Sequence, residues 1–292
     1  MRGVQAMLLS TVVLWALNLT VSRYIIKHGF EPLAYSTVRY GVASVLFLLI
    51  VLVFERSLAI ARRDLWLVGI AALMLFLNQV AFVSALDATT ASTTALILGA
   101  TPIFAALIGL ALRIERLSRR FWIAAAVSFA GVGLVAVGNG ELSGDLAGDL
   151  WGVATGATWA AYSLAIAPLM ARYSASRISA VVLPLAWVGM AAAGAQQVSG
   201  QNFDLGWGVW SLLAFAILGP LVLTNVMWFR VLHSIGAARA TLVANLQPFL
   251  AAVFAVILLS EHIAPVQIAG GALIAGGILL ARRRSALPPA GE

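Results

Sequence analysis

Long apolar runs separated by short polar connections dominate the chain. Each run is close to the ~20 residues that a helix needs to cross the ~30 Å hydrocarbon layer of a bilayer. Runs of this length without polar alternation indicate helices, which satisfy their own backbone hydrogen bonds in lipid. The pattern predicts an all-α membrane protein with ten transmembrane helices, at residues 4–22, 32–54, 65–86, 91–112, 121–138, 150–171, 178–198, 207–229, 240–260 and 264–281.

The composition supports the same class. Of 292 residues, 62% are hydrophobic and 10% are charged, with a mean hydropathy of +1.00, whereas soluble domains have about 25% charged residues. Ten spans leave only short connections, so we expect no soluble catalytic domain. The first apolar run is longer than the core of about 7–15 residues in a secretory signal, and we interpret it as a span. The chain has no cysteine, which excludes disulfides and thiolate metal sites, and we expect no metal and no cofactor.

The net charge of +7 is concentrated in particular loops. Fifteen of the eighteen Lys and Arg residues lie either at the two ends of the chain or in every second connection between predicted spans. Cytoplasmic loops of membrane proteins carry this excess of basic residues, so both termini are predicted to be cytoplasmic. This distribution explains the basic charge without a nucleic-acid partner.

The two halves of the chain resemble each other at an offset of 146 positions. Pro102 aligns with Pro248, Glu115 with Glu261, and Gly131 with Gly277. Five spans per half is an odd number, so the second half must cross the membrane in the opposite direction. Inverted repeats are typical of secondary transporters, whose substrate site lies between the repeats near the midplane. We therefore predict two inverted five-helix repeats, at residues 1–140 and 147–285, with a disordered tail at 286–292.

Several motifs resemble the EamA-type drug/metabolite transporter superfamily. Trp15-Ala-Leu-Asn18 through Arg23 is similar to its first-span pattern, although Ala16 and Arg23 replace the usual Gly and Lys. Ala124 likewise stands where the second copy keeps a glycine, Gly270. Further residues match the patterns of later spans: Ala85, Leu86, Ala95, Pro102, Glu115, Gly131, Ala238, Pro248, Glu261, Gly270 and Gly277. The resemblance implies a ten-helix carrier in a bacterial inner membrane that exports metabolites, and it is nearest to exporters of amino acids, including aromatic ones.

Aromatic and polar side chains share helical faces in four spans, two from each half. Residues three apart lie on one face of a helix, and apolar pockets with a few polar groups are typical of binding sites. The alternatives are packing or hydrogen bonds between helices, worth about 0.6 kcal/mol on average. Trp66, Trp122, Trp151, Trp207 and Trp210 lie near span ends and are interpreted as interfacial belts. The predicted substrate-binding residues are Trp15, Asn18, Asn78, Gln79, Phe82, Trp159, Tyr162, Asn225 and Trp228.

Pro102 and Pro248 lie in the middle of the fourth and ninth predicted spans. A proline inside a helix removes a backbone donor and kinks or breaks the helix, and breaks at corresponding positions of two repeats indicate a transport site. A bend needed only for packing is the alternative. The predicted hinge or gating residues are Pro102, Pro248, Thr101, Asn245 and Gln247.

Arg39 is the only ionisable residue inside the ten predicted runs. It can contact a substrate carboxylate, pair with Glu31 or Asp87, or extend its head group to the interface. Glu115 and Glu261 follow the fourth and ninth spans and are expected to tether helix ends. Proton-coupled carriers use carboxylates or histidines inside the membrane. Their absence from the runs favours facilitated transport down the solute gradient, or coupling through a group that the sequence does not identify.

These observations favour a secondary transporter, not an enzyme, that exports small zwitterionic metabolites, with aromatic or neutral amino acids expected first. An exporter of lipophilic drugs or cations is the main alternative, and a multi-span scaffold without transport is the alternative from another class. Nucleotide-sugar carriers would need several central basic residues. The expected partners are the small-molecule substrate and the lipid bilayer, and the chain is expected to act as a monomer.

Overall fold

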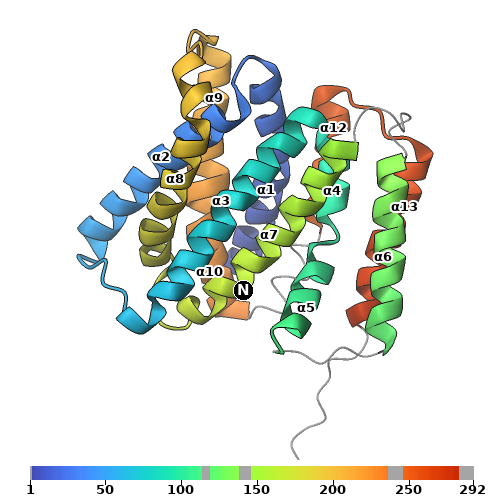
Figure 1. Ribbon diagram of the computed structural model, residues 1–292, viewed down its shortest axis with the longest axis horizontal. Coiled ribbons are helices and arrows are strands. Elements are labelled where there is room, and N and C mark those ends of the chain that lie inside the picture. Colours follow the sequence, from blue (N-terminus) through green and yellow to red (C-terminus); the bar gives the residue numbers. More distant parts are fainter. Residues whose placement is uncertain (1, 114–118, 138–145, 236–245, 283–292) are drawn as a thin grey trace, which may run out of the picture.

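The computed structural model describes residues 2–113, 119–137, 146–235 and 246–282, which form helices and no strand (Figure 1). The first half contains α1 (Arg2–Lys27), α2 (Pro32–Phe54), η1 (Arg62–Asp64), α3 (Leu65–Ala88), α4 (Ala91–Leu98), α5 (Thr101–Ala111) and α6 (Arg119–Val137). The second half contains α7 (Leu146–Met170), α8 (Ala175–Gly200), α9 (Gly206–Ile217), the π-helical segment η2 (Leu218–Leu223), α10 (Thr224–Ile235), α12 (Gln247–Leu259) and α13 (Pro265–Arg282). The predicted all-α class is confirmed for these residues.

Six helical segments of the described chain are long and apolar enough to cross a bilayer. They comprise α1, α2, α3 with η1, α7, α8, and the stretch from α9 into α10. A seventh is added if α4 and α5, which meet at an angle of 45°, count as one span. The apolar parts of α6, α12 and α13 are shorter. The protein is therefore a multi-pass membrane protein, whereas the count of ten spans stays a prediction.

Several helices are longer than the uncharged runs from which they were predicted. The first helix continues through Arg23 to Lys27, and α3 includes Asp87. Asp149, expected in a loop, lies buried in the first turn of α7. Charged side chains fit in these end turns because polar groups of neighbouring helix ends are within reach there; Lys27 Nζ, for example, lies 2.9 Å from Asp87 Oδ1.

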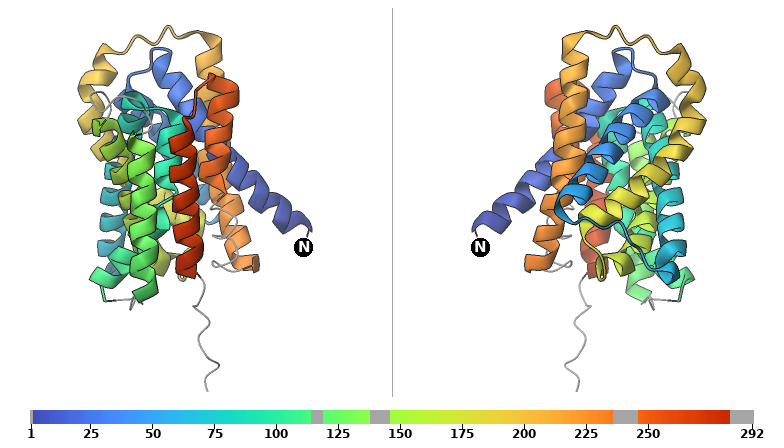
Figure 2. Two further views of the ribbon diagram at one scale, coloured as in Figure 1. Left: turned by 90° about the vertical axis from the view of Figure 1, so that its right-hand side faces the viewer. Right: turned by 90° about the vertical axis from the view of Figure 1, so that its left-hand side faces the viewer.

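Helices at equivalent positions of the two halves pack against each other in antiparallel pairs. In one pair, α2 lies along α8: the backbone N–H of Leu33 donates to Gln197 (2.7 Å), and the Trp187 indole donates to the Thr37 carbonyl (3.0 Å). In the other pair, α6 lies along α13 at the opposite end of the molecule (Figures 1 and 2).

The approach of α6 to α13 depends on glycine. A Cβ atom at Gly131 would lie 2.6 Å from the Gly270 carbonyl oxygen, and one at Gly277 would lie 2.6 Å from the Ala124 carbonyl oxygen. Small residues allow helix backbones to approach closely in membranes, where van der Waals packing drives helix association. Gly131 of α6 and Gly277 of α13, which align in the repeat, thus both allow the two backbones to approach each other.

Helices α1, α3, α7 and α10 form two equivalent interfaces between the halves. In the first, α1 packs on α10, and in the second, α3 packs on α7. At the offset of the sequence repeat, α7 corresponds to α1, and α9 to α10 correspond to α3. The first helix of each half therefore packs on the third helix of the other half: α1 on α10, and α7 on α3.

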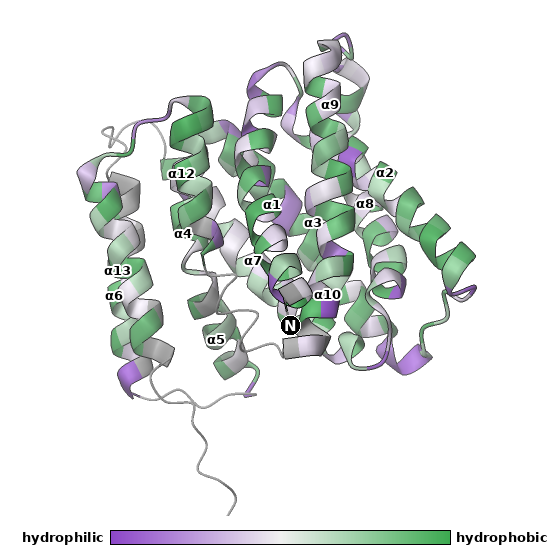
Figure 3. Ribbon diagram, turned by 180° about the vertical axis from the view of Figure 1, so that it is seen from behind, coloured by the Kyte–Doolittle hydropathy of each residue, from purple (hydrophilic) through white to green (hydrophobic). Residues whose placement is uncertain are grey.

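The described connections gather at two ends of the bundle, where the hydropathy colouring is most polar (Figure 3). Contacts define one end: Lys27 reaches Asp87, and Gln201 bonds the backbone of Gly29 and Glu31. At the other end, Arg172 pairs with Asp64. If successive spans cross the membrane in alternate directions, connections on the same side should lie together, and these contacts agree with that arrangement.

Candidate substrate site between the two halves

Trp15 of α1 meets Trp228 and Thr224 of α10. The two indole rings are 5.1 Å apart between centroids at an interplanar angle of 56°. The Trp15 indole N–H donates to the Thr224 hydroxyl (2.9 Å), which in turn donates to the Pro220 carbonyl (2.6 Å). Two predicted substrate-binding residues from different halves are thereby brought into contact.

Asn78 of α3 makes the corresponding contact at the other interface. Its amide donates to the carbonyl of Thr155 (2.9 Å) and to the hydroxyl of Thr158 (3.3 Å) on α7. The side chain of Gln79 donates to the Asn78 oxygen (2.9 Å). The Gln79 oxygen is buried and accepts no hydrogen bond from the described residues, so it is an available acceptor inside the bundle.

The other predicted pocket residues contact neighbours of their own. Trp159 and Tyr162 of α7 have ring centroids 5.3 Å apart, and Trp159 is 39% exposed. Phe82 and Tyr162 are buried in the same apolar cluster. Asn18 accepts a long hydrogen bond from Ser22 (3.5 Å), and the Asn225 oxygen accepts one from Ser179 (3.3 Å).

Arg39 points into the bundle and is 3% exposed. Its guanidinium carbon lies 5.8 Å from the ring centroid of Tyr35 and 5.7 Å from that of Tyr40, which is within cation–π range. Among the described residues it pairs with neither Glu31 nor Asp87, which were the predicted ionic partners. The interfacial alternative is also wrong, because the head group is enclosed.

Tyr35 connects this arginine to α1. Its hydroxyl lies 2.7 Å from the Ser22 hydroxyl, one turn from Asn18. Tyr40 and Tyr162 of α7 are buried in the same apolar cluster. Polar and aromatic groups of α1 and α2 thus meet beside Arg39.

The fourth predicted span is broken close to the predicted proline. One helix ends at Leu98 and the next begins at Thr101, so that Pro102 lies in the first turn of α5. The Thr101 hydroxyl donates to the Leu98 carbonyl (2.7 Å), which the break leaves without its helical partner. Pro248 similarly lies in the first turn of α12, just after Gln247, whereas Asn245 lies outside the described residues.

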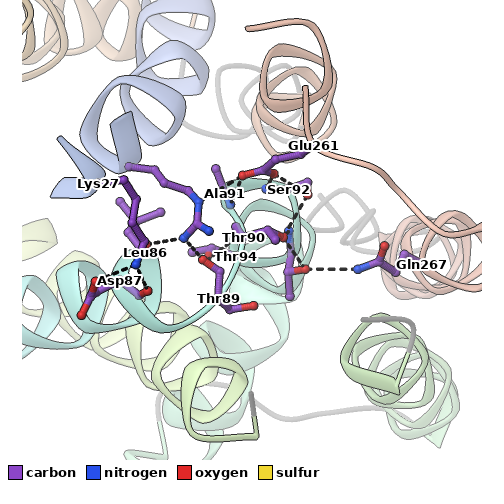
Figure 4. A network of polar contacts seen from close by, with 12 residues as sticks. Lys27, Leu86, Asp87, Thr89, Thr90, Ala91, Ser92, Thr94, Glu261 and Gln267 are labelled. Carbon is purple, nitrogen blue, oxygen red and sulfur yellow. Dashed lines mark hydrogen bonds and ion pairs between the residues drawn. The ribbon is translucent and has the colours of Figure 1, made fainter. Parts of the chain in front are cut away.

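A polar network joins the two halves at one end of the bundle (Figure 4). Glu261, in the connection between α12 and α13, accepts hydrogen bonds from the backbone N–H groups of Ala91 and Ser92 (both 3.0 Å) at the start of α4. It also pairs with Arg23 of α1 (3.1 Å), and Arg23 donates to the carbonyls of Leu86 and Thr89. The prediction that Glu261 tethers helix ends is confirmed; Glu115 lies outside the described residues.

Gln267 extends this network into α13. Its side-chain nitrogen donates to the Thr93 hydroxyl (3.1 Å), and its oxygen accepts from the backbone N–H of Ala264 (2.8 Å). The start of α4 is thereby held by two residues of the second half.

The opposite end of the bundle has its own contacts between halves. Asp64 binds both Arg172 and the hydroxyl of Tyr173 (2.7 Å). Glu55 accepts from Ser174 (2.5 Å) and from Arg177 (3.2 Å) at the start of α8. These groups have structural partners already, so they are poor candidates for substrate contacts.

Two grooves on the surface of the described residues are lined by residues other than those predicted to bind substrate. One lies between α2 and Trp187, and the other lies at the start of α3 beside Pro168 and Arg172. Within the described residues, no group of three or more His, Asp or Glu side chains is placed to hold a metal ion.

Sequence reasoning missed Thr224, Tyr35 and Pro220. Thr224 lies 146 positions after Asn78, so the repeat itself contained a signal for it. Tyr35 lies one turn before Arg39, which places the two side chains on one helical face. Pro220 lies within an apolar run and resembled an ordinary span residue.

Solved structures and family profiles provide independent comparisons. Sixteen solved chains match, among them a crystal structure with a TM-score of 0.64 and 19% sequence identity, covering 97% of this chain and 99% of that one. Likeness at this identity establishes the fold alone. No curated protein matches the chain. The profile of the EamA-like transporter family matches twice, at residues 2–137 and 146–283, and so covers both repeats. The protein therefore belongs to the EamA-like transporter family, a family of membrane transporters.

Proposed function

We propose that this protein is a secondary transporter that exports small zwitterionic metabolites, with aromatic and neutral amino acids as its first substrates. Transport proceeds by alternating access to a pocket near the midplane, between the repeats. The protein acts as a monomer in a bacterial inner membrane with both termini in the cytoplasm. The observation that carries the proposal is the repeated contact between halves, Trp15 with Thr224 and Trp228 on one side and Asn78 with α7 on the other.

The chemistry of these groups supports a zwitterionic solute with an apolar side chain. Indole and phenol rings provide large apolar surfaces, and each also carries a polar group. The Gln79 oxygen is an acceptor suited to an ammonium group, and Arg39 is a buried cation. Pockets that combine apolar walls with a few placed polar groups bind small molecules of this kind.

The energy source proposed here is the gradient of the solute itself. Between the helix ends, the described spans contain Arg39 but no carboxylate or histidine that could relay protons through the midplane. Asp149 is a buried carboxylate, but it lies in the first turn of α7. Facilitated export therefore requires no further group.

The test is transport into proteoliposomes with a panel of labelled amino acids, with and without a pH gradient. We expect uptake of at least one aromatic or neutral amino acid, independent of the pH gradient. Transport of a quaternary cation and of no amino acid would favour drug export instead. Uptake that requires the pH gradient would contradict facilitated transport and direct attention to Asp149.

The pocket is tested with tryptophan variants. Trp228→Ala removes the ring against Trp15, and such ring pairs contribute about 0.5–1.5 kcal/mol, so we expect transport to fall about 2- to 10-fold. Trp159→Ala is expected to act similarly. The matched control is Trp207→Ala, since Trp207 is 91% exposed at a helix end. Wild-type rates in both Trp228→Ala and Trp159→Ala, at equal expression, would reject the pocket.

A further inference from the structure

The helix that follows α9 departs from regular geometry beside Arg39. Residues Leu218–Leu223 form a π-helical segment that contains Pro220. Proline has no backbone N–H, so the Ala216 carbonyl, four residues earlier, cannot receive its usual helical hydrogen bond. Single π-helical turns inside α-helices are frequently found at functional sites.

Arg39 provides the missing donor from another helix. Its Nε lies 3.4 Å from the Ala216 carbonyl oxygen. This is the one hydrogen bond that the guanidinium donates to the described residues, although the group has five N–H donors. The contact uses the Nε donor. It leaves the N–H donors of the two Nη nitrogens, at the outer edge of the planar head group, without an acceptor among the described residues.

The charge of Arg39 also lacks a counter-ion in the described part of the chain. A buried charge without an ionic partner is strongly destabilising, and two tyrosine rings offset only part of that cost, about 2 kcal/mol at a desolvated site. Guanidinium groups bind carboxylates through two parallel N–H donors. A carboxylate from the substrate would supply both the missing charge and the missing acceptors.

We propose that Arg39, positioned by the carbonyl that Pro220 frees, is the group that recognises the substrate carboxylate. The inference rests on the proposed function and narrows it to solutes that carry a carboxylate. Arg39 binds the ligand directly, whereas Pro220 is a positioning residue that acts through the Ala216 carbonyl. Tyr35 and Tyr40 flank the head group and limit its movement.

Thermal stabilisation of the purified full-length protein tests the proposal without requiring transport. The ligands are phenylalanine and leucine, their amides, which lack the carboxylate charge, and phenylpyruvate, which lacks the ammonium group. We expect the wild-type protein to bind each acid at least about tenfold more tightly than its amide, as charge-assisted hydrogen bonds would give. Arg39→Gln should abolish that preference and leave amide binding unchanged.

Two further variants separate binding from positioning. Arg39→Lys keeps the charge but loses the planar fork, so we expect it to retain part of the preference. Pro220→Ala restores a backbone N–H that can bond the Ala216 carbonyl, and we expect acid binding to weaken about two- to tenfold. Arg62→Gln, at an exposed position of η1, is the control.

Each outcome of these binding measurements supports or overturns one part of the proposal. Binding of phenylpyruvate but of no amino acid, lost in Arg39→Gln, would support the carboxylate site and reject amino acids as substrates. Preference for acids over amides that survives in Arg39→Gln and Arg39→Lys would overturn the role of Arg39 but leave amino-acid transport standing. Equal binding of acids and amides by the wild type would overturn the carboxylate site outright. Unchanged acid binding in Pro220→Ala would overturn the positioning role.

Discussion

Glu261 concentrates the contacts between the two halves on a single carboxylate. It accepts from two backbone N–H groups, from the Ser92 hydroxyl (2.8 Å) and from Arg23, and it is 9% exposed. The N–H groups at the start of a helix have no intrahelical partner, and a negative charge there is favoured by the helix dipole. One side chain thus satisfies the start of α4 and neutralises a cation of α1.

Replacing Glu261 by Gln should destabilise the protein more than replacing an exposed acid. Charged hydrogen bonds contribute about 1.5–3 kcal/mol, so we expect Glu261→Gln to lower the free energy of unfolding by about that amount. Asp87→Asn is the matched control, because the Lys27–Asp87 pair is about half exposed and such pairs are worth less than about 1 kcal/mol. Thermal unfolding in one detergent measures both. An equal loss in the two variants would contradict the structural role of Glu261.

The sequence predicted individual residues well where their chemistry is unusual in a membrane. Arg39 and Glu261 stood out because charges are costly in lipid and must have a reason to be near it. Thr224 did not stand out, because threonine hydroxyls commonly bond the preceding turn of their own helix and need no distant partner. Its contact with Trp15 depends on how α1 crosses α10, which the sequence of either helix alone does not specify.

At the scale of the helix, the apolar runs predicted where helices lie but not where they end. The run beginning at residue 4 was expected to end at 22, yet α1 continues to Lys27, because Arg23 and Lys27 bond Leu86 and Asp87 of α3. The run at 207–229 predicted a continuous helix, whereas η2 interrupts it around Pro220. Both differences arise from backbone and side-chain partners on other helices.

The contact between α6 and α13 provides a test with neighbouring glycines. A Cβ at Gly277 would meet the Ala124 carbonyl and the Ser128 side chain, whereas a Cβ at Gly276 would meet nothing within 4 Å. Overpacking costs about 1–3 kcal/mol, so Gly277→Ala should unfold at a lower temperature. Gly276→Ala should be neutral or stabilising by up to about 1 kcal/mol, because glycine weakens a helix. Equal melting temperatures for the two variants would show that the helices do not approach this closely.

At the scale of the whole molecule, the repeat explains why contacts between the halves occur in equivalent pairs. The alignment of Pro102 with Pro248 and of Gly131 with Gly277 indicated two related halves, and the family profile matches both. The antiparallel contact of α6 with α13 follows if the halves are related by a rotation about an axis in the membrane plane. Which helices touch across such an axis could not be predicted, because apolar faces of similar composition can pair in several ways.

The predicted inverted orientation of the halves can be tested with single cysteines, because the sequence itself contains none. Single cysteines at positions 146 residues apart should lie on opposite sides of the membrane. His28 and Ser174 form one such pair, and Arg62 and Gly208 form another; all four residues are exposed in the structure. With cytoplasmic termini, a membrane-impermeant maleimide should label His28→Cys and Gly208→Cys in intact cells.

Ser174→Cys and Arg62→Cys should react only after permeabilisation, because their loops carry the basic residues that remain in the cytoplasm. The unmodified protein, which has no thiol, gives the background. Labelling of all four positions with the sides exchanged would keep the inverted repeat but reverse the orientation. Labelling of both members of a pair from the same side would contradict the inversion itself. It would also contradict the proposal that the solute crosses between two halves of opposite orientation.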